Sequence, residues 1–116
     1  MVESYRDLKV WQRAVQMTLG IYRVTTGFPK EELFGLTSQM RRAAVSVASS
    51  IAEGYGRNSK GEYKQFLGIA RGSNLELQTQ LFIAVELGYG DPGLLREAES
   101  PSNEVAKMLN SLVAKL

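Results

Sequence analysis

The stretch LTSQMRRAAVSVASSIAEGYGRNSKGE, residues 36–62, contains the signals for one helix, one turn and the start of a second helix. Over residues 36–55 the apolar side chains recur at spacings of three and four, which is typical of an amphipathic helix. Its apolar face consists of Leu36, Met40, Ala43, Ala44, Val47 and Ile51. Its polar face carries Arg42, Ser46, Ser49 and Glu53.

The glycines after this helix predict a turn between helices and not a phosphate-binding loop. A P-loop requires GxxxxGK[ST], but Gly54 is followed by the sequence SKG at 59–61, which displaces both the second glycine and the hydroxyl. A dinucleotide-binding fingerprint follows a strand, whereas Gly54 and Gly56 follow a helix. We expect both glycines to end the helix in the left-handed conformation. Ser59 and Glu62 then predict a capping box for the next helix.

The residues before this stretch predict a helix over residues 5–25. Ser4 and Asp7 have the spacing of a capping box, and Gly27 ends the helix. A stripe of large apolar residues at spacings of three and four is expected to face the core. This stripe consists of Leu8, Trp11, Val15, Leu19 and Tyr22.

The residues after the turn predict a long helix over residues 59–87. Its expected core stripe is Tyr63, Phe66, Ala70, Leu77, Leu81 and Ala84, and further apolar residues lie outside this stripe. Gly68 and Gly72 each cost about 1 kcal/mol relative to alanine in a helix interior, which a closely packed neighbouring helix would offset. We therefore expect this helix to contact a second subunit. The predicted interface consists of Leu67, Gly68, Gly72, Leu75 and Phe82.

The last helix is predicted over residues 92–115. Asp91 is its expected N-cap and Pro92 its first residue. Pro101 predicts a break or kink near residue 101, with Ser100 capping the second piece. The expected core stripe is Val105, Met108, Leu109, Leu112 and Leu116. Four amphipathic helices with short connections predict an all-α, antiparallel up-down four-helix bundle, with residues 1–116 as a single domain.

The composition argues against most enzymatic functions. The 116 residues include no cysteine and no histidine, so the thiol nucleophile and the commonest general base are both missing. Carboxylates such as Glu53 and Glu76 do not converge on one predicted core face, so neither a metal site nor any other cofactor is expected. No apolar run approaches the roughly 20 residues of a membrane span, and the N-terminal residues do not resemble a secretory signal. We expect a noncatalytic, cytoplasmic protein.

Charge is distributed unevenly along the chain. Residues 41–72 carry six basic and two acidic side chains, whereas residues 73–116 carry three basic and six acidic ones. The basic segment could bind a polyanion, could meet the acidic segment of another subunit, or could be an ordinary solvated surface. Tyr55 and Tyr63 could stack on bases. The candidate nucleic-acid-binding residues are Arg41, Arg42, Arg57, Lys60, Lys64 and Arg71.

Four motifs carry a resemblance to a known family. They are YRDLKVWQRA at 5–14, FPKEELFGLTSQMRRAAVSV at 28–47, SIAEGYGR at 50–57 and FLGIARGSNLELQTQLFIAVELGY at 66–89. Together they resemble the 23S rRNA intervening-sequence protein family over essentially the whole chain. The resemblance implies a small bacterial four-helix bundle that forms a ring-shaped homopentamer. The family often has the sequence VPSNIAEG, in which this chain has Ala48 and Ser50 instead of proline and asparagine.

The resemblance and the charge pattern lead to two functional hypotheses. Some members of the family are encoded within insertions in the large ribosomal RNA gene. A related branch, the accessory variability determinant of diversity-generating retroelements, binds RNA and reverse transcriptase. The first hypothesis is therefore an oligomeric nucleic-acid-binding protein, with structured RNA as its ligand. The alternative is a structural adaptor that assembles protein partners, such as a reverse transcriptase, without binding nucleic acid.

Overall fold

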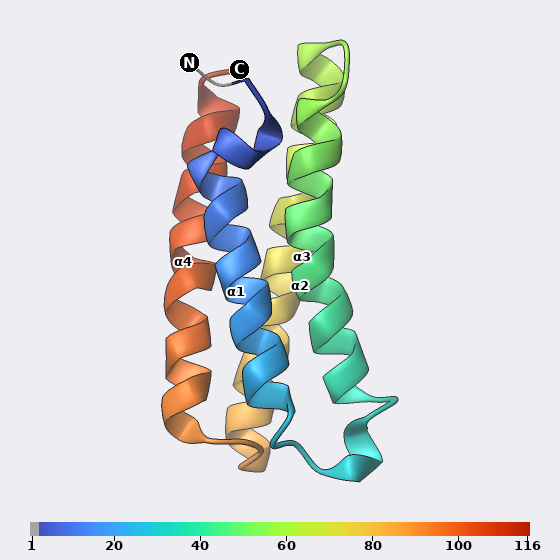
Figure 1. The fold of residues 1–116 in the computed structure, drawn as a ribbon, viewed down its shortest axis with the longest axis vertical. Helices are drawn as coiled ribbons and strands as arrows, with labels where there is room; N and C mark the ends of the chain where they lie inside the picture. The colour runs from blue at the N-terminus through green and yellow to red at the C-terminus, as the bar shows by residue number, and fades with distance from the viewer. Residues whose placement is uncertain (1–2) are drawn as a thin grey trace.

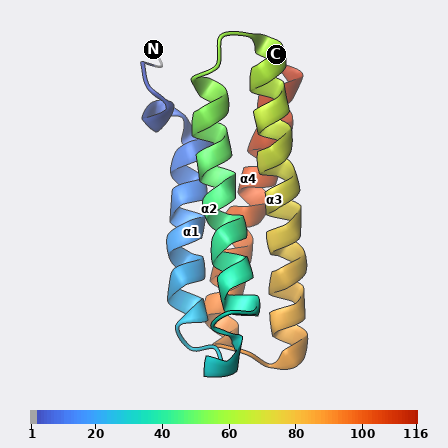
Figure 2. The same ribbon diagram turned by 90° about the vertical axis from the view of Figure 1, so that its right-hand side faces the viewer.

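The computed structural model describes residues 3–116, which form four long helices and two short 3-10 helices (Figure 1). The long helices are α1 (Lys9–Thr25), α2 (Leu36–Tyr55), α3 (Lys60–Leu87) and α4 (Pro92–Ala114). The short ones, η1 (Tyr5–Asp7) and η2 (Lys30–Glu32), precede α1 and α2. Consecutive long helices run in opposite directions, as Figures 1 and 2 show. The prediction of an all-α helical bundle is confirmed.

Each long helix packs against two others, in the cyclic order α1, α2, α3, α4. The molecule measures 43 × 23 × 20 Å, so the helices lie along its long axis. Side chains from all four helices fill one apolar core. Its largest fully buried residues include Met17, Ile21, Met40, Ile51, Leu67, Leu77, Leu81 and Leu109. Leu67 was predicted to lie outside the core stripe of α3, and this placement is wrong.

Of the predicted core face of α1, Leu8 and Trp11 pack against the core, but the rest of the stripe is wrong. The buried stripe consists of Val10, Ala14, Met17, Ile21 and Val24. On the predicted stripe, Leu19 is 57% exposed and Tyr22 is 43% exposed. Both stripes have helical spacing, so α1 is apolar on two faces, and periodicity alone could not tell which face meets the bundle. The helix also begins at Lys9, because the capping box of Ser4 and Asp7 closes the separate turn η1.

The glycines after α2 do not adopt the predicted left-handed conformation. Gly56 has a φ of −80°, and Gly54 lies inside α2, where it is buried. A Cβ atom at Gly54 would lie 2.8 Å from the Cβ atom of Phe66, so this glycine permits the close approach of α3. The left-handed glycines are Gly88 (φ 72°) and Gly90 (φ 70°), which end α3 and redirect the chain into α4.

The α4 helix continues through Pro101, so the predicted break is wrong. Its start agrees with the prediction, because Asp91 Oδ1 accepts hydrogen bonds from the backbone N–H groups of residues 93 and 94 at 2.8 and 3.0 Å. Proline removes one helical hydrogen bond, but Ser102 and Val105 beyond it are fully buried. Packing against the core therefore keeps the helix continuous past the proline.

Candidate nucleic-acid interface and subunit surface

The outer surface of α3 is unusually apolar for a solvent-exposed helix. Among its exposed side chains, Leu75 is 56% exposed and Phe82 is 63% exposed. Ile69, Ile83, Val85 and Leu87 are also exposed. Of the predicted interface residues, Gly68, Gly72, Leu75 and Phe82 lie on this surface. Leu67 does not, because it is completely buried in the core of its own bundle and cannot contact a second chain.

Gly68 and Gly72 are not required by the packing of the bundle itself. A Cβ atom built at either position would meet no atom within 4 Å. Gly54 differs, because there a Cβ atom would collide with the adjacent helix. Glycine in a helix interior costs roughly 1 kcal/mol relative to alanine, and among the described residues no contact at positions 68 and 72 offsets that cost.

Three of the predicted basic residues form a line along the N-terminal half of α3. Lys60, Lys64 and Arg71 are exposed, and their positions lie within about 40° of one another around the helix axis. The line extends for about 16 Å, given the rise of a helix. Arg57 precedes it in the connection between α2 and α3, which lies at the end of the bundle seen at the top of Figure 2.

Aromatic side chains lie next to Arg57 at this end of the bundle. The Arg57 guanidinium lies 4.5 Å from the centre of the Phe66 ring, within the range of a cation–π contact. Tyr55 and Tyr63 contact each other edge to face, with ring centres 6.3 Å apart. Partial burial raises the pKa of Tyr63, and the neighbouring Tyr55 adds to this effect. Both tyrosines are half-buried.

Arg41 does not belong to this basic line. Its Nε donates a hydrogen bond to Thr25 Oγ1 at 2.9 Å, and its guanidinium lies 4.7 Å from the centre of the Tyr22 ring. Both partners belong to α1, so Arg41 links α1 to α2. This contact was not predicted, because Thr25 and Arg41 are 16 positions apart in the sequence and lie on different helices.

Arg42 lies on the other side of α2, at a groove between α2 and α3. The groove has a volume of about 330 Å³ and is also lined by Ser46, Ser73 and Glu76. The hydroxyl oxygens of the two serines lie 2.9 Å apart and connect the helices. Arg42 lies about 20 Å along α2 from its C-terminal end, and Arg71 lies about 16 Å along the antiparallel α3 from its N-terminal end, so the two residues stand at a similar level of the bundle.

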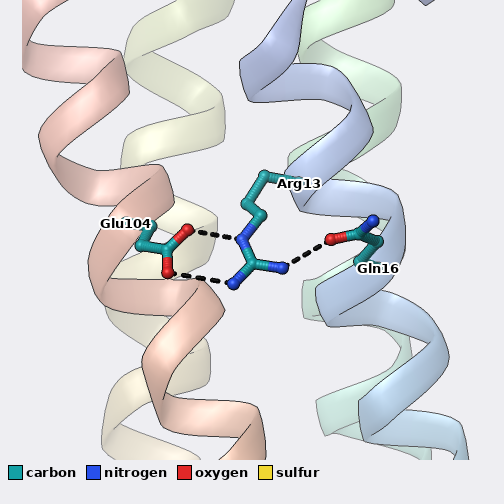
Figure 3. Close-up of polar contacts among 3 residues, drawn as sticks. All are labelled: Arg13, Gln16 and Glu104. Carbon is teal, nitrogen blue, oxygen red and sulfur yellow. Dashed lines mark hydrogen bonds and ion pairs between the residues drawn. The ribbon is translucent and has the colours of Figure 1, made fainter.

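One acidic residue of the C-terminal segment, Glu104, forms an ion pair with Arg13 across the bundle. Glu104 on α4 accepts two hydrogen bonds from Arg13 on α1, at 2.5 and 2.9 Å (Figure 3). Arg13 also donates to Gln16 Oε1 at 2.5 Å. These bonds lower the pKa of Glu104 below its usual value. The sequence contains no signal for this pair, because its members are 91 residues apart.

Among residues 3–116, no three acidic side chains come close enough together to hold a metal ion. None of the described helices combines the length and the apolar character needed to cross a membrane.

Comparison with known proteins places the chain in a family. A solved structure of a protein with unknown function from the S23 ribosomal protein family of Bacteroides thetaiotaomicron VPI-5482 has the same fold, with a TM-score of 0.80. The two chains are 20% identical, and the match covers 90% of this chain and 97% of the other. Comparison with curated proteins gives no match. The family model described as 23S rRNA-intervening sequence protein matches residues 6–111, and the chain therefore belongs to this family.

Proposed function

We propose that the chain is a noncatalytic protein that assembles with copies of itself and binds structured RNA along the N-terminal half of α3. The observation that carries this proposal is the exposed line of Lys60, Lys64 and Arg71, with Arg57 beside it. Within residues 3–116, none of these four side chains belongs to an ion pair. Unpaired cations at this spacing can contact several phosphates and release their counterions.

Two further considerations support RNA as the ligand. The family is named for sequences that interrupt 23S rRNA, which connects it to nucleic acid. The aromatic side chains near Arg57 offer partly exposed rings on which an unpaired base could stack. RNA loops and bulges present such bases, whereas duplex DNA does not.

Self-assembly forms part of the proposal, because four cations on one chain provide only a weak phosphate-binding surface. Repeating the line around a ring would multiply its contacts without any new residue. Gly68, Gly72, Leu75 and Phe82 supply the proposed subunit contact on α3, where the two glycines would allow a neighbouring helix to come close. The family resemblance implies five copies.

The test is a titration of the purified protein with a structured RNA and a duplex DNA at ~50 and ~200 mM salt, beside its native mass. The triple variant Lys60→Ala, Lys64→Ala, Arg71→Ala should lose RNA affinity and retain its assembly. A matched control removes three exposed cations elsewhere, by Lys9→Ala, Lys107→Ala and Lys115→Ala. Equal losses in both triple variants would show that net charge, and not the α3 line, determines binding.

A second candidate function is an adaptor that assembles protein partners, such as a reverse transcriptase. The exposed apolar surface of α3 favours it, because such a surface suits a protein partner as well as another copy of the chain. An assembled protein that binds no RNA at ~50 mM salt would exclude RNA binding and leave the adaptor.

A further inference from the structure

Phe34 is the most exposed large apolar side chain among the described residues, with 93% of its surface accessible. It lies in the connection between α1 and α2, beside Leu33, which is 50% exposed. A single exposed apolar residue on a mobile loop would be ordinary. The surroundings of Phe34 are instead held by specific hydrogen bonds.

Glu32 fixes the turn that presents Phe34. Its Oε1 accepts a hydrogen bond from the backbone N–H of Leu36 at 3.0 Å, and its Oε2 accepts one from the Tyr89 hydroxyl at 3.0 Å. Its backbone carbonyl accepts a third, from the N–H of Gly35 at 2.9 Å. A Cβ atom at Gly35 would lie 2.6 Å from Glu32 Oε1, so the glycine makes room for this carboxylate.

These bonds hold the backbone of the turn that carries Phe34. Glu32 connects η2 to the first turn of α2 and to the connection between α3 and α4. The turn therefore presents the Phe34 ring to solvent, where 93% of its surface is accessible. A backbone turn that is already ordered loses little conformational entropy on binding, which is favourable for the presentation of an anchor residue.

The same chain has an apolar cavity of about 300 Å³ at the connection between α3 and α4. Val85, Tyr89, Pro92 and Leu95 contribute apolar surface to it. Figure 1 shows this connection at the same end of the bundle as the turn of Phe34, with the two displaced to different sides. A cavity of this size accommodates an aromatic side chain.

Each of the two features is flanked by one basic and one acidic side chain. Exposed Lys30 and Glu31 lie beside the turn that carries Phe34, and exposed Arg96 and Glu99 line the cavity. In a complex, each charged side chain near Phe34 can meet one of opposite sign at the cavity. Such pairs at the edge of an interface fix the orientation of the partners more than they add affinity.

We propose that Phe34 of one copy inserts into the cavity formed by Val85, Tyr89, Pro92 and Leu95 in a second copy. The proposal rests on the self-assembly proposed above and specifies a contact for it. Phe34 and the cavity are different surfaces of one chain, so the contact is heterologous and can generate a ring. Val85 lies on α3, one turn from Phe82, so this contact continues the proposed subunit surface.

The absence of cysteine from the sequence permits a direct test by cross-linking. Copies carrying Phe34→Cys are mixed with copies carrying Val85→Cys and oxidised, and a disulfide-linked dimer of the two is expected. The control mixture replaces Phe34→Cys by Leu19→Cys, which places the thiol on another exposed apolar position, since Leu19 on α1 is 57% exposed. Equal cross-linking in the control would overturn the proposed contact.

Native mass gives the second measurement. Phe34→Ser and Val85→Glu should each weaken self-association by at least about tenfold, as expected for an anchor residue. Their mixture retains one intact contact and should form a one-to-one dimer. If wild type assembles and Phe34→Ser has the same mass at every concentration, the Phe34 contact is wrong and self-assembly stands. If wild type remains monomeric at high micromolar concentration, both proposals fail.

Discussion

Asn74 on α3 and Ser102 on α4 exchange two hydrogen bonds inside the core of the bundle. Asn74 Nδ2 donates to the Ser102 carbonyl oxygen at 3.0 Å, and Ser102 Oγ donates to Asn74 Oδ1 at 2.8 Å. Asn74 is 1% exposed and Ser102 is not exposed at all. Gln78 Nε2 donates a hydrogen bond to Ser102 Oγ at 3.0 Å. The pair fixes the alignment of α4 against α3 next to Pro101.

Replacing one member of this pair is expected to destabilise the protein. Asn74→Leu keeps a similar volume but leaves a buried hydroxyl without its acceptor, which costs about 1–3 kcal/mol. Urea unfolding followed by circular dichroism gives the free energy of unfolding. Because the double variant Asn74→Leu, Ser102→Ala removes both polar groups, its loss should be smaller than the sum of the single losses. Additive losses would show that the two hydrogen bonds contribute no coupling energy.

The helices of this bundle could be predicted because local signals mark them. The apolar stripes of α2 and α4 have helical spacing, and Asp91 caps α4 as expected. Ser59 caps α3 by accepting a hydrogen bond from the Glu62 N–H, which is one half of the predicted capping box. The core face of α1 could not be predicted in the same way, since α1 has two apolar stripes. The break predicted at Pro101 is wrong because proline acts locally, whereas the burial of Ser102 and Val105 depends on the other helices. Their burial outweighs the helical hydrogen bond that the proline removes.

The candidate site could be predicted only in part, because its geometry depends on pairs that are distant in sequence. The line of Lys60, Lys64 and Arg71 follows from helical spacing within one segment. The contacts of Arg41 with α1 and the pairing of Asn74 with Ser102 join separate helices. A pattern along one helix contains no information about such partners.

Gly68→Ala and Gly72→Ala should have opposite effects on the isolated chain and on its assembly. Each alanine should stabilise the folded monomer by about 1 kcal/mol, because the new Cβ atom meets open space in the bundle. The same methyl groups should weaken self-association if a neighbouring helix lies against these glycines. Urea unfolding of dilute protein measures the first effect, and native mass at high concentration measures the second.

Gly54→Ala is the matched control, since it is also a glycine-to-alanine change within a helix. Its Cβ atom would lie 2.8 Å from that of Phe66, so this variant should be less stable than wild type. If Gly68→Ala and Gly72→Ala leave assembly unchanged while stabilising the chain, the proposed contact at the two glycines is wrong.

The pair of Arg13 and Glu104 should make stability depend on pH in the acidic range. The hydrogen bonds from Arg13 lower the pKa of Glu104 below its ordinary value of 4.5. A lowered pKa contributes stability that is complete above the ordinary value and is lost as pH falls through the lowered one. Glu104→Gln removes the charge at every pH. Its urea midpoint should be lower than that of wild type near neutral pH and equal to it at ~pH 2.

Lys107→Met is a control for this titration, because it removes another α4 charge that contributes to the lowered pKa of Glu104 only weakly. The difference between wild type and this variant should change little with pH over the same range. A Glu104→Gln difference that persists unchanged at ~pH 2 would mean that the side chain stabilises the protein through packing and not through its charge.

Arg41 and Lys64 should separate stability from RNA binding. The Arg41 guanidinium donates to Thr25 Oγ1 and covers the Tyr22 ring, so Arg41→Ala should lower the free energy of unfolding by about 1 kcal/mol. Because Arg41 belongs to the contact with α1, this variant should retain RNA affinity close to that of wild type. Lys64 is exposed in the basic line, so Lys64→Ala should leave stability unchanged and reduce the salt dependence of RNA binding by about one phosphate contact.

Urea unfolding and RNA titrations at several salt concentrations measure both quantities for both variants. The opposite pattern, with RNA affinity lost in Arg41→Ala and retained in Lys64→Ala, would place the phosphate-binding surface on α1 and α2 instead of α3.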